Sequence, residues 1–214
     1  MRIHFSTVRC CAFTMAELLV TIAIIAILLS IAVPVYRSLV EKSRVTADLS
    51  NLRQLGLATR AFTNDHGYMM GAPWPTSLNP AYLPDWRPFK SPFDKRPPSD
   101  NPETAPVSYD LNGHLWGLRP VQIASPSHCI LFSPLLADPE RLQFMSTAWL
   151  PSTPAPLSIR SCGEMAKGGT HLEGTEINVI YCDLHAASIP MTDFHSPLPN
   201  PDDSSPISDL RWNR

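Results

Sequence analysis

The chain has 214 residues, which is room for one globular domain with its own core, a further helix and irregular extensions. Its formal net charge is −2 at pH 7, so no broad positive field favours nucleic acid, and we expect no nucleic-acid partner. Proline accounts for 23 residues, and this abundance predicts that much of the distal half is loop.

An uncharged stretch runs from Leu18 to Tyr36. As a helix it would rise about 28 Å, close to the roughly 30 Å hydrocarbon core of a bilayer. Residues 1–16 contain Arg2 and Arg9 and no acid, which modestly favours a cytoplasmic N-terminus. The stretch therefore predicts a single membrane span.

Glu17 stands directly before this stretch. A secretory signal peptide has no use for a carboxylate there, and its apolar region is usually only about 7 to 15 residues long. A plain signal anchor would not need it either, because a carboxylate that enters hydrocarbon is costly and usually functional. A signal-anchored extracytoplasmic enzyme or binding protein is the alternative, and Glu17 disfavours it.

Around Glu17 the sequence reads Ala12-Phe13-Thr14-Met15-Ala16-Glu17-Leu18-Leu19-Val20. This stretch resembles the prepilin cleavage and methylation motif of type IV pilins and type II secretion pseudopilins. The resemblance implies a leader at residues 1–12, cleavage between Ala12 and Phe13, and N-methylation of Phe13. Glu17 and Pro34 then become the fifth and twenty-second mature residues, where the family has Glu and Pro. Ala12 replaces the family's usual Gly.

The resemblance also implies that Glu17 serves assembly. In a filament of such helices the Phe13 amino group would lie in apolar surroundings, where an unpaired charge is costly. Glu17 of a neighbouring subunit would neutralise it and favour one axial register. The plainer alternative is a helix-end carboxylate with no partner. Pro34 is expected to kink the helix, because it lacks a backbone donor.

The expected function is therefore that of a pseudopilin or minor pilin in a type II secretion pseudopilus or type IV pilus-like filament, and not that of an enzyme. The expected partners are a prepilin peptidase, other pilin or pseudopilin subunits, an inner-membrane assembly platform and membrane lipid. The expected location is the bacterial inner membrane, single-pass, with a periplasmic C-terminal domain. The machine stays open among secretion, adhesion, motility and DNA uptake.

Residues 13–36 are expected to form the transmembrane and polymerisation helix, and residues 37–66 its amphipathic continuation. The apolar positions at helical spacing are Val45, Leu49, Leu52, Leu55 or Ala58, and Phe62, with Glu41, Lys42, Arg44, Asp48 and Arg53 interspersed as polar positions. Asn64 to Gly67 supply residues that close a helix. The pattern predicts one helix of about fifty residues.

Residues 67–189 are expected to form an extracytoplasmic pilin-like domain. Within it, residues 71–106 hold ten prolines and five aromatic residues, which predicts an ordered loop pinned by its rings. The predicted strands are Val107–Leu111, His128–Phe132, Glu176–Cys182 and His185–Ile189. The expected fold class is α+β, with a long helix packed on a small antiparallel sheet.

The last two strands predict a hairpin across Asp183-Leu184. Residues 171–189 resemble the C-terminal segment of prepilin-like proteins of Planctomycetes and Verrucomicrobia, in which a Gly stands at the place of Leu184. Leucine seldom takes the positive φ of a tight turn, so a different turn or local strain is expected. Residues 190–214 are expected to be a flexible tail.

Cys10 and Cys11 would leave with the leader, so Cys129, Cys162 and Cys182 allow one disulfide and one free thiol, and the pair stays open. The four residues that might gather around a metal are His171, Asp183, His185 and His195. No metal site is expected from them, because a hairpin turn presents polar residues to water, and calcium is kept only as a weak alternative. Ser161 and Ser188 lie in no catalytic serine motif, and no cofactor is expected.

Overall fold

The computed structural model describes residues 14–71, 74–101, 105–134, 169–195 and 210. The chain divides into two compact units, residues 1–42 and residues 43–214, which are described separately. The expected leader, residues 1–12, lies outside the described residues, and so do Cys162 and Ser161.

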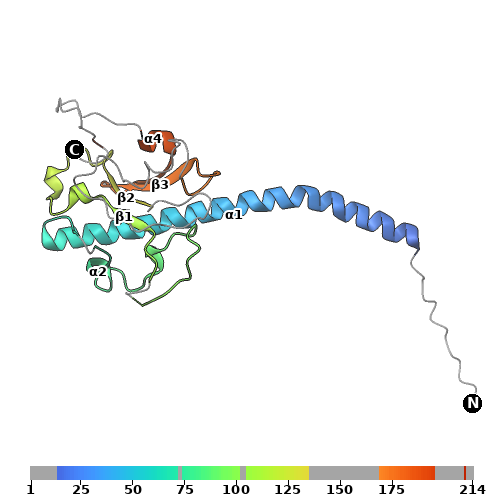
Figure 1. Cartoon of the computed structure of the whole chain (residues 1–214), viewed down its shortest axis with the longest axis horizontal. Coiled ribbons are helices and arrows are strands. Elements are labelled where there is room, and N and C mark those ends of the chain that lie inside the picture. The colour runs from blue at the N-terminus through green and yellow to red at the C-terminus, as the bar shows by residue number, and fades with distance from the viewer. Residues whose placement is uncertain (1–13, 72–73, 102–104, 135–168, 196–209, 211–214) are drawn as a thin grey trace, which may run out of the picture. The chain divides into compact units, whose positions relative to one another are not determined.

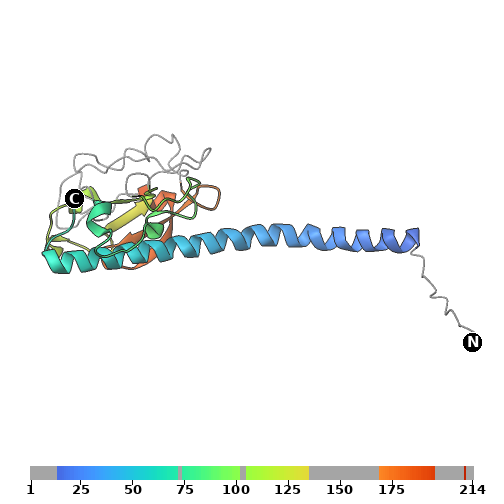
Figure 2. The ribbon, with the colours of Figure 1, turned by 90° about the horizontal axis from the view of Figure 1, so that it is seen from below.

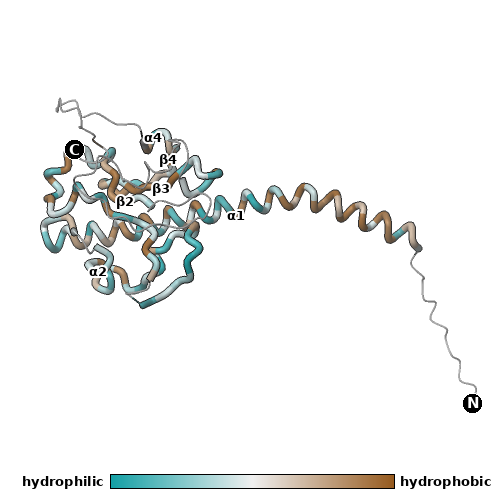
Figure 3. The backbone as a smooth tube through the Cα atoms, viewed as in Figure 1, coloured by the Kyte–Doolittle hydropathy of each residue, from teal (hydrophilic) through white to brown (hydrophobic). Residues whose placement is uncertain are grey.

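The first helix, α1, spans Met15–His66, so the prediction of one helix of about fifty residues is confirmed. In the first unit its side chains are exposed on every side, and its backbone tube is mostly hydrophobic, with hydrophilic residues between them (Figure 3). Its most apolar window has a mean hydropathy of 2.9, which is sufficient for a membrane span by length and composition. Pro34 lies inside this helix, and the kink expected there stays a prediction.

In the second unit α1 becomes one-faced. Leu52, Leu55, Ala58 and Phe62 are buried in the main hydrophobic cluster, as the spacing predicts. The helix ends at His66, and Gly67 follows with φ +80° and donates its N–H to the Thr63 carbonyl at 2.8 Å. The stop predicted around Gly67 is therefore confirmed, because glycine takes this left-handed conformation without steric cost.

A four-stranded antiparallel sheet of order β1-β2-β3-β4 lies along the C-terminal part of α1 (Figures 1 and 2). The strands are β1 Tyr109–Leu111, β2 Ile130–Pro134, β3 Glu176–Tyr181 and β4 Ala186–Pro190. Each predicted strand is present, with ends that differ by no more than two residues. The central strands β2 and β3 carry buried apolar side chains, so the sheet and α1 enclose the core.

The β3–β4 hairpin turns through Leu184, whose φ is +76°. The Tyr181 N–H donates to the His185 carbonyl and the Leu184 N–H to the Tyr181 carbonyl, so the turn holds three residues and differs from the predicted two-residue turn. Leucine in its left-handed position is also strained, so both expected outcomes are present. The Leu184 side chain packs against the main cluster, and a Cβ added to Gly56 of α1 would lie 3.2 Å from its Cδ2. Because Gly56 has no side chain, the hairpin can approach the helix closely.

The proline-rich segment is ordered where it is described, as predicted. It holds a short helix, α2, at Trp74–Leu78 and a 3₁₀ turn, η1, at Arg87–Phe89, and its described residues contain no strand. Its buried rings are Trp74, Trp86, Phe89 and Phe93. Two more 3₁₀ turns follow, η2 at Gly113–Leu115 and η3 at Pro120–Gln122.

The prediction that a flexible tail begins at residue 190 is wrong. Residues Met191–His195 form a further helix, α4, whose Met191 and Phe194 are buried against β2 and β3 residues. A side chain that is removed from water in this way stabilises the domain by about 1.5 to 3 kcal/mol. The ordered domain therefore extends to residue 195, and the rest of the expected tail, apart from Leu210, lies outside the described residues.

Substitutions at Leu184 should separate strain from packing. Leu184→Ala keeps the positive φ and loses the packing, whereas Leu184→Gly loses the packing but relieves the strain. We expect the Ala variant to unfold at a lower urea concentration, with a free energy of unfolding about 1 kcal/mol below that of the Gly variant. Fluorescence of the buried Trp74 and Trp86 reports the transition, and equal stability of the two variants would contradict the strain.

Candidate processing and assembly site

The N-terminus of α1 is closed by Thr14 and Glu17. The Glu17 Oε2 atom accepts hydrogen bonds from the Thr14 backbone N–H and from the Thr14 hydroxyl, each at 2.9 Å. The Thr14 Oγ1 atom accepts from the Glu17 N–H at 3.2 Å. This reciprocal pair is a capping box, which satisfies two backbone donors that have no partner within the helix. Glu17 thus has a local role at its own helix end, and its pairing with a neighbouring subunit stays a prediction.

The cap places negative charge where the helix dipole favours it. Glu17 is exposed in the isolated chain, and a carboxylate can accept about four hydrogen bonds. The two that come from Thr14 both end on Oε2, so the capping role does not use the full acceptor capacity of the group. Glu17 can therefore cap its own helix and still accept hydrogen bonds from a cation.

The apolar surface that follows Glu17 has no buried face in the single chain. Ile22, Ile24, Ile25 and Ile27 point in different directions around α1, and each keeps more than half of its surface exposed. A helix that is apolar all round belongs in hydrocarbon or among other helices. This surface therefore needs lipid or further subunits to cover it.

The predicted site residues are only partly placed. Ala12 and Phe13, the expected cleavage and methylation positions, lie outside the described residues. Glu17 and Pro34 lie on the same helix but at opposite ends of the uncharged stretch, so they do not form one site. Among the described residues, the contact partner of Glu17 is Thr14, which belongs to the sequence motif.

A second polar site surrounds Asp48 in the core, and the sequence reasoning missed it. Asp48 was treated as a polar position of the amphipathic helix, but it is fully buried. Its carboxylate accepts from the hydroxyls of Ser91 and Tyr109, each at 2.5 Å, and from the Asn178 amide at 2.8 Å. The signal was its position: residues 45, 48, 52 and 55 follow the helical spacing of a buried stripe.

The Asp48 cluster joins four parts of the domain: α1, the proline-rich segment, β1 and β3. Burial raises the pKa of Asp48, although its three hydrogen bonds and the nearby His171 oppose this change. Burial and the adjacent Asp48 carboxylate raise the pKa of Tyr109 well above its usual range, so the phenol remains a donor. The Asn178 Oδ1 atom is buried without a hydrogen-bond partner. The cluster therefore fixes how these segments meet, but it carries a desolvation cost.

His171 and Ser188 are brought together, but not as a catalytic triad. The His171 Nε2 atom lies 2.7 Å from Ser188 Oγ, and the Ser188 hydroxyl donates to Glu176 at 2.9 Å. The acid also lies 3.3 Å from Nε2, whereas in a triad it would hold Nδ1, which here contacts Thr170. The arrangement ties residue 171 to β4, so its geometry supports a structural role.

The metal candidates that the structure describes do not form a metal site. Asp183 and His185 pair with each other in the hairpin turn, with 2.6 Å between Oδ1 and Nδ1. Across residues 14–71, 74–101, 105–134 and 169–195, no group of three His, Cys, Asp or Glu residues has the arrangement of a metal site. The backbone of His195 belongs to α4.

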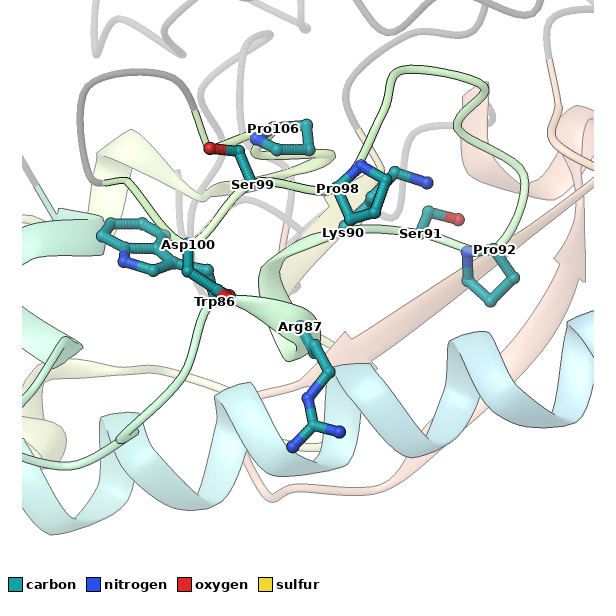
Figure 4. A pocket seen from close by; sticks show the side chains of 9 residues that line it. All are labelled: Trp86, Arg87, Lys90, Ser91, Pro92, Pro98, Ser99, Asp100 and Pro106. Atoms are coloured by element: carbon teal, nitrogen blue, oxygen red, sulfur yellow. The ribbon is translucent and has the colours of Figure 1, made fainter.

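A small pocket of about 140 Å³ lies in the proline-rich segment, between Trp86, Pro92, Pro98 and Pro106 (Figure 4). Its two cationic side chains are already engaged. Arg87 pairs with Asp85 at 2.7 Å, and the Lys90 ammonium donates to the Asp94 carbonyl at 2.6 Å. The pocket therefore does not offer these two cations to an anionic ligand.

Residues 8–33 match the family defined by the prokaryotic N-terminal methylation motif, the prepilin-type cleavage and methylation signature. Together with the apolar helix, this motif indicates a type IV pilin-like or pseudopilin-like, membrane-anchored protein that is processed by prepilin peptidase and associates with other pilins. It also indicates a structural rather than a catalytic protein. No curated protein and no solved structure matches the chain.

Replacement of Asp48 should alter how stability depends on pH. Its pKa is raised in the folded state above the ordinary value of 3.8, so the stability it contributes is full below pH 3.8 and is lost as pH rises through the folded pKa. Asp48→Asn removes this titration. Once the Asn178 side-chain amide flips, the new Asn amide group can also donate to Asn178 Oδ1, which is buried without a partner in the parent chain. We expect the Asn variant to gain stability relative to the parent chain as the pH is raised from 4 to 7 in urea titrations.

Asp48→Leu is the matched contrast, because it leaves the donors of Ser91, Tyr109 and Asn178 without their acceptor. We expect its free energy of unfolding at pH 7 to fall by about 3 kcal/mol or more, against a change within about 1 kcal/mol for Asp48→Asn. A Leu variant as stable as the Asn variant would show that these hydrogen bonds contribute nothing.

Proposed function

We propose that this chain is a structural subunit, a pseudopilin or minor pilin, of a type II secretion pseudopilus or type IV pilus-like filament. The methylation motif at residues 8–33 is the observation that carries the proposal. The exposed apolar surface of α1 supports it, since such a surface suits storage in the membrane and later burial against other subunits.

In this proposal the peptidase cuts between Ala12 and Phe13, and the new Phe13 amino group is methylated. The leader is residues 1–12, and residues 13–36 span the membrane and later polymerise. Residues 37–66 continue the helix into the domain, which extends to residue 195. The basic Arg2 and Arg9 favour a cytoplasmic leader, which leaves the domain on the periplasmic side.

The assembly step depends on Glu17. A subunit that enters the filament brings the charged amino group of Phe13 into apolar surroundings, where it requires a counter-charge. The Thr14 cap holds the Glu17 carboxylate in place at the helix end and leaves part of its acceptor capacity for the neighbouring amino group. The ion pair between Glu17 and the neighbouring amino group would stabilise one axial stagger of the subunits relative to the others.

The partners of the proposed subunit follow from these steps. A prepilin peptidase cuts the chain, membrane lipid covers it before assembly, and an inner-membrane assembly platform delivers it to other pilin or pseudopilin subunits. The net charge of −2 supports no nucleic-acid partner.

Three variants separate the cap from the charge. Glu17→Gln keeps an acceptor for Thr14 but removes the charge, Glu17→Ala removes both, and Thr14→Ala weakens the cap but keeps the charge. We expect all three to enter the membrane, as measured by sedimentation with the membrane fraction. Cross-linked multimers in host cells should fall about tenfold for both Glu17 variants and remain near the parent level for Thr14→Ala.

Normal multimer formation by Glu17→Gln would contradict the charge-pairing step. A loss shared equally by Thr14→Ala would instead assign the effect to the capping box, because that variant keeps the carboxylate. Failure of Glu17→Gln to reach the membrane would show that the residue acts before assembly.

A further inference from the structure

Two cysteines face each other across the central strands of the sheet. Cys129 directly precedes β2, and Cys182 directly follows β3. The antiparallel register pairs Ile130 with Tyr181, so the next opposed pair toward this end of the strands is Cys129 and Cys182. The Cys182 N–H donates to the Cys129 carbonyl at 2.9 Å, which shows that the two backbones are in direct contact.

The spacing of opposed residues in an antiparallel pair suits a disulfide. Their Cα atoms are about 4.5 to 5.5 Å apart, within the range of about 4.4 to 6.8 Å that disulfides span. Both side chains lie on the same face, because Cys129 belongs to the main hydrophobic cluster and Cys182 packs against it. Both cysteines are free thiols in this structure, and their side chains lie on the same side of adjacent strands at a backbone spacing that disulfides span.

From this geometry we propose that Cys129 and Cys182 form the disulfide of the mature protein, which leaves Cys162 as the free thiol. The bridge rests on the proposed function, since it needs the domain to lie in an oxidising, extracytoplasmic compartment. It would link residue 129 to residue 182 and hold β2 against β3 beside the turn of the last hairpin.

The oxidant is a disulfide of the thiol–disulfide exchange class, such as an oxidoreductase of the compartment or oxidised glutathione. One thiolate attacks the oxidant and forms a mixed disulfide, which the second cysteine resolves. One S–S bond forms in the protein and one breaks in the oxidant. The two electrons and two protons of the cysteine thiols end on the two thiols of the reduced oxidant.

The surroundings of the pair determine when the exchange takes place. The Cys129 side chain, hydrogen-bonded to the Cys182 thiol, and burial both raise the pKa of Cys182. The Cys182 thiol of the folded, reduced chain therefore stays protonated and is a poor nucleophile. Oxidation is therefore expected during folding, as β2 and β3 come together. Because Cys129 is fully buried, a soluble thiol could reach the finished bridge only through the partly buried Cys182.

The pairing is tested by mapping the disulfide of the full chain in two settings. In the first, the purified chain in detergent is reduced, unfolded in urea and refolded with oxidised glutathione. In the second, host cells are quenched with N-ethylmaleimide before lysis. Peptide mass spectrometry without reduction should then find Cys129 joined to Cys182 and Cys162 alkylated in both settings.

The outcomes separate the pairing from the location. A bridge to Cys162 in the refolded chain would overturn the pairing and leave the extracytoplasmic location untouched. A Cys129–Cys182 bridge that forms on refolding but is absent from cells would overturn the disulfide of the mature protein and would also count against that location. Cys129 and Cys182 both alkylated in both settings would overturn the proposal outright.

Thermal unfolding provides a second readout. In Cys162→Ser, which keeps the proposed pair, the unfolding midpoint should fall by roughly 10 °C when the chain is reduced before the scan. The matched control, Cys129→Ser with Cys182→Ser, should show no such fall. A midpoint of Cys162→Ser that does not respond to reduction would contradict the bridge.

Discussion

The apolar first half of α1 must be removed from water, and the rest of the molecule depends on how that is done. Fourteen large apolar side chains between Met15 and Tyr36 are exposed in the single chain, and burying each would contribute about 1 kcal/mol or more. Lipid can cover them before assembly, and neighbouring helices can cover them afterwards. The difference between these two coverings is small per residue, because lipid tails are as apolar as leucine. Specific assembly therefore needs a polar interaction, and Glu17 stands where such an interaction can form.

A related logic applies inside the domain, where α1 meets the sheet. An apolar stripe decides which face of a helix meets a sheet but does less to fix the axial position of the helix. The Asp48 carboxylate fixes this position, because it accepts hydrogen bonds from the proline-rich segment, β1 and β3 at once. Its desolvation reduces stability, so the cluster is better understood as a device for one defined packing than as a source of stability. The strained Leu184 is similar: an unfavourable backbone conformation places an apolar side chain over Gly56.

Long periodic patterns made most of the fold predictable. The helix, its stop at Gly67 and all four strands follow from spacing and turn residues. The burial of Asp48 is not predicted, because charged residues are usually exposed, although its position fits the buried stripe. Helix α4 escaped because five residues carry no helical period, and only the sheet beneath Met191 and Phe194 makes them helical. The processing motif was recognisable from sequence, whereas the Thr14 cap on Glu17 required coordinates.

The central claim is that prepilin-type processing creates the end of the chain that assembles. Mass spectrometry of the N-terminal peptide, taken from membranes of the native host, tests it most directly. The account predicts a chain that begins at N-methylated Phe13, with residues 1–12 absent. An intact Met1 would contradict it, and so would a cut beyond Val33, because either result would place the chain among signal-anchored or secreted proteins.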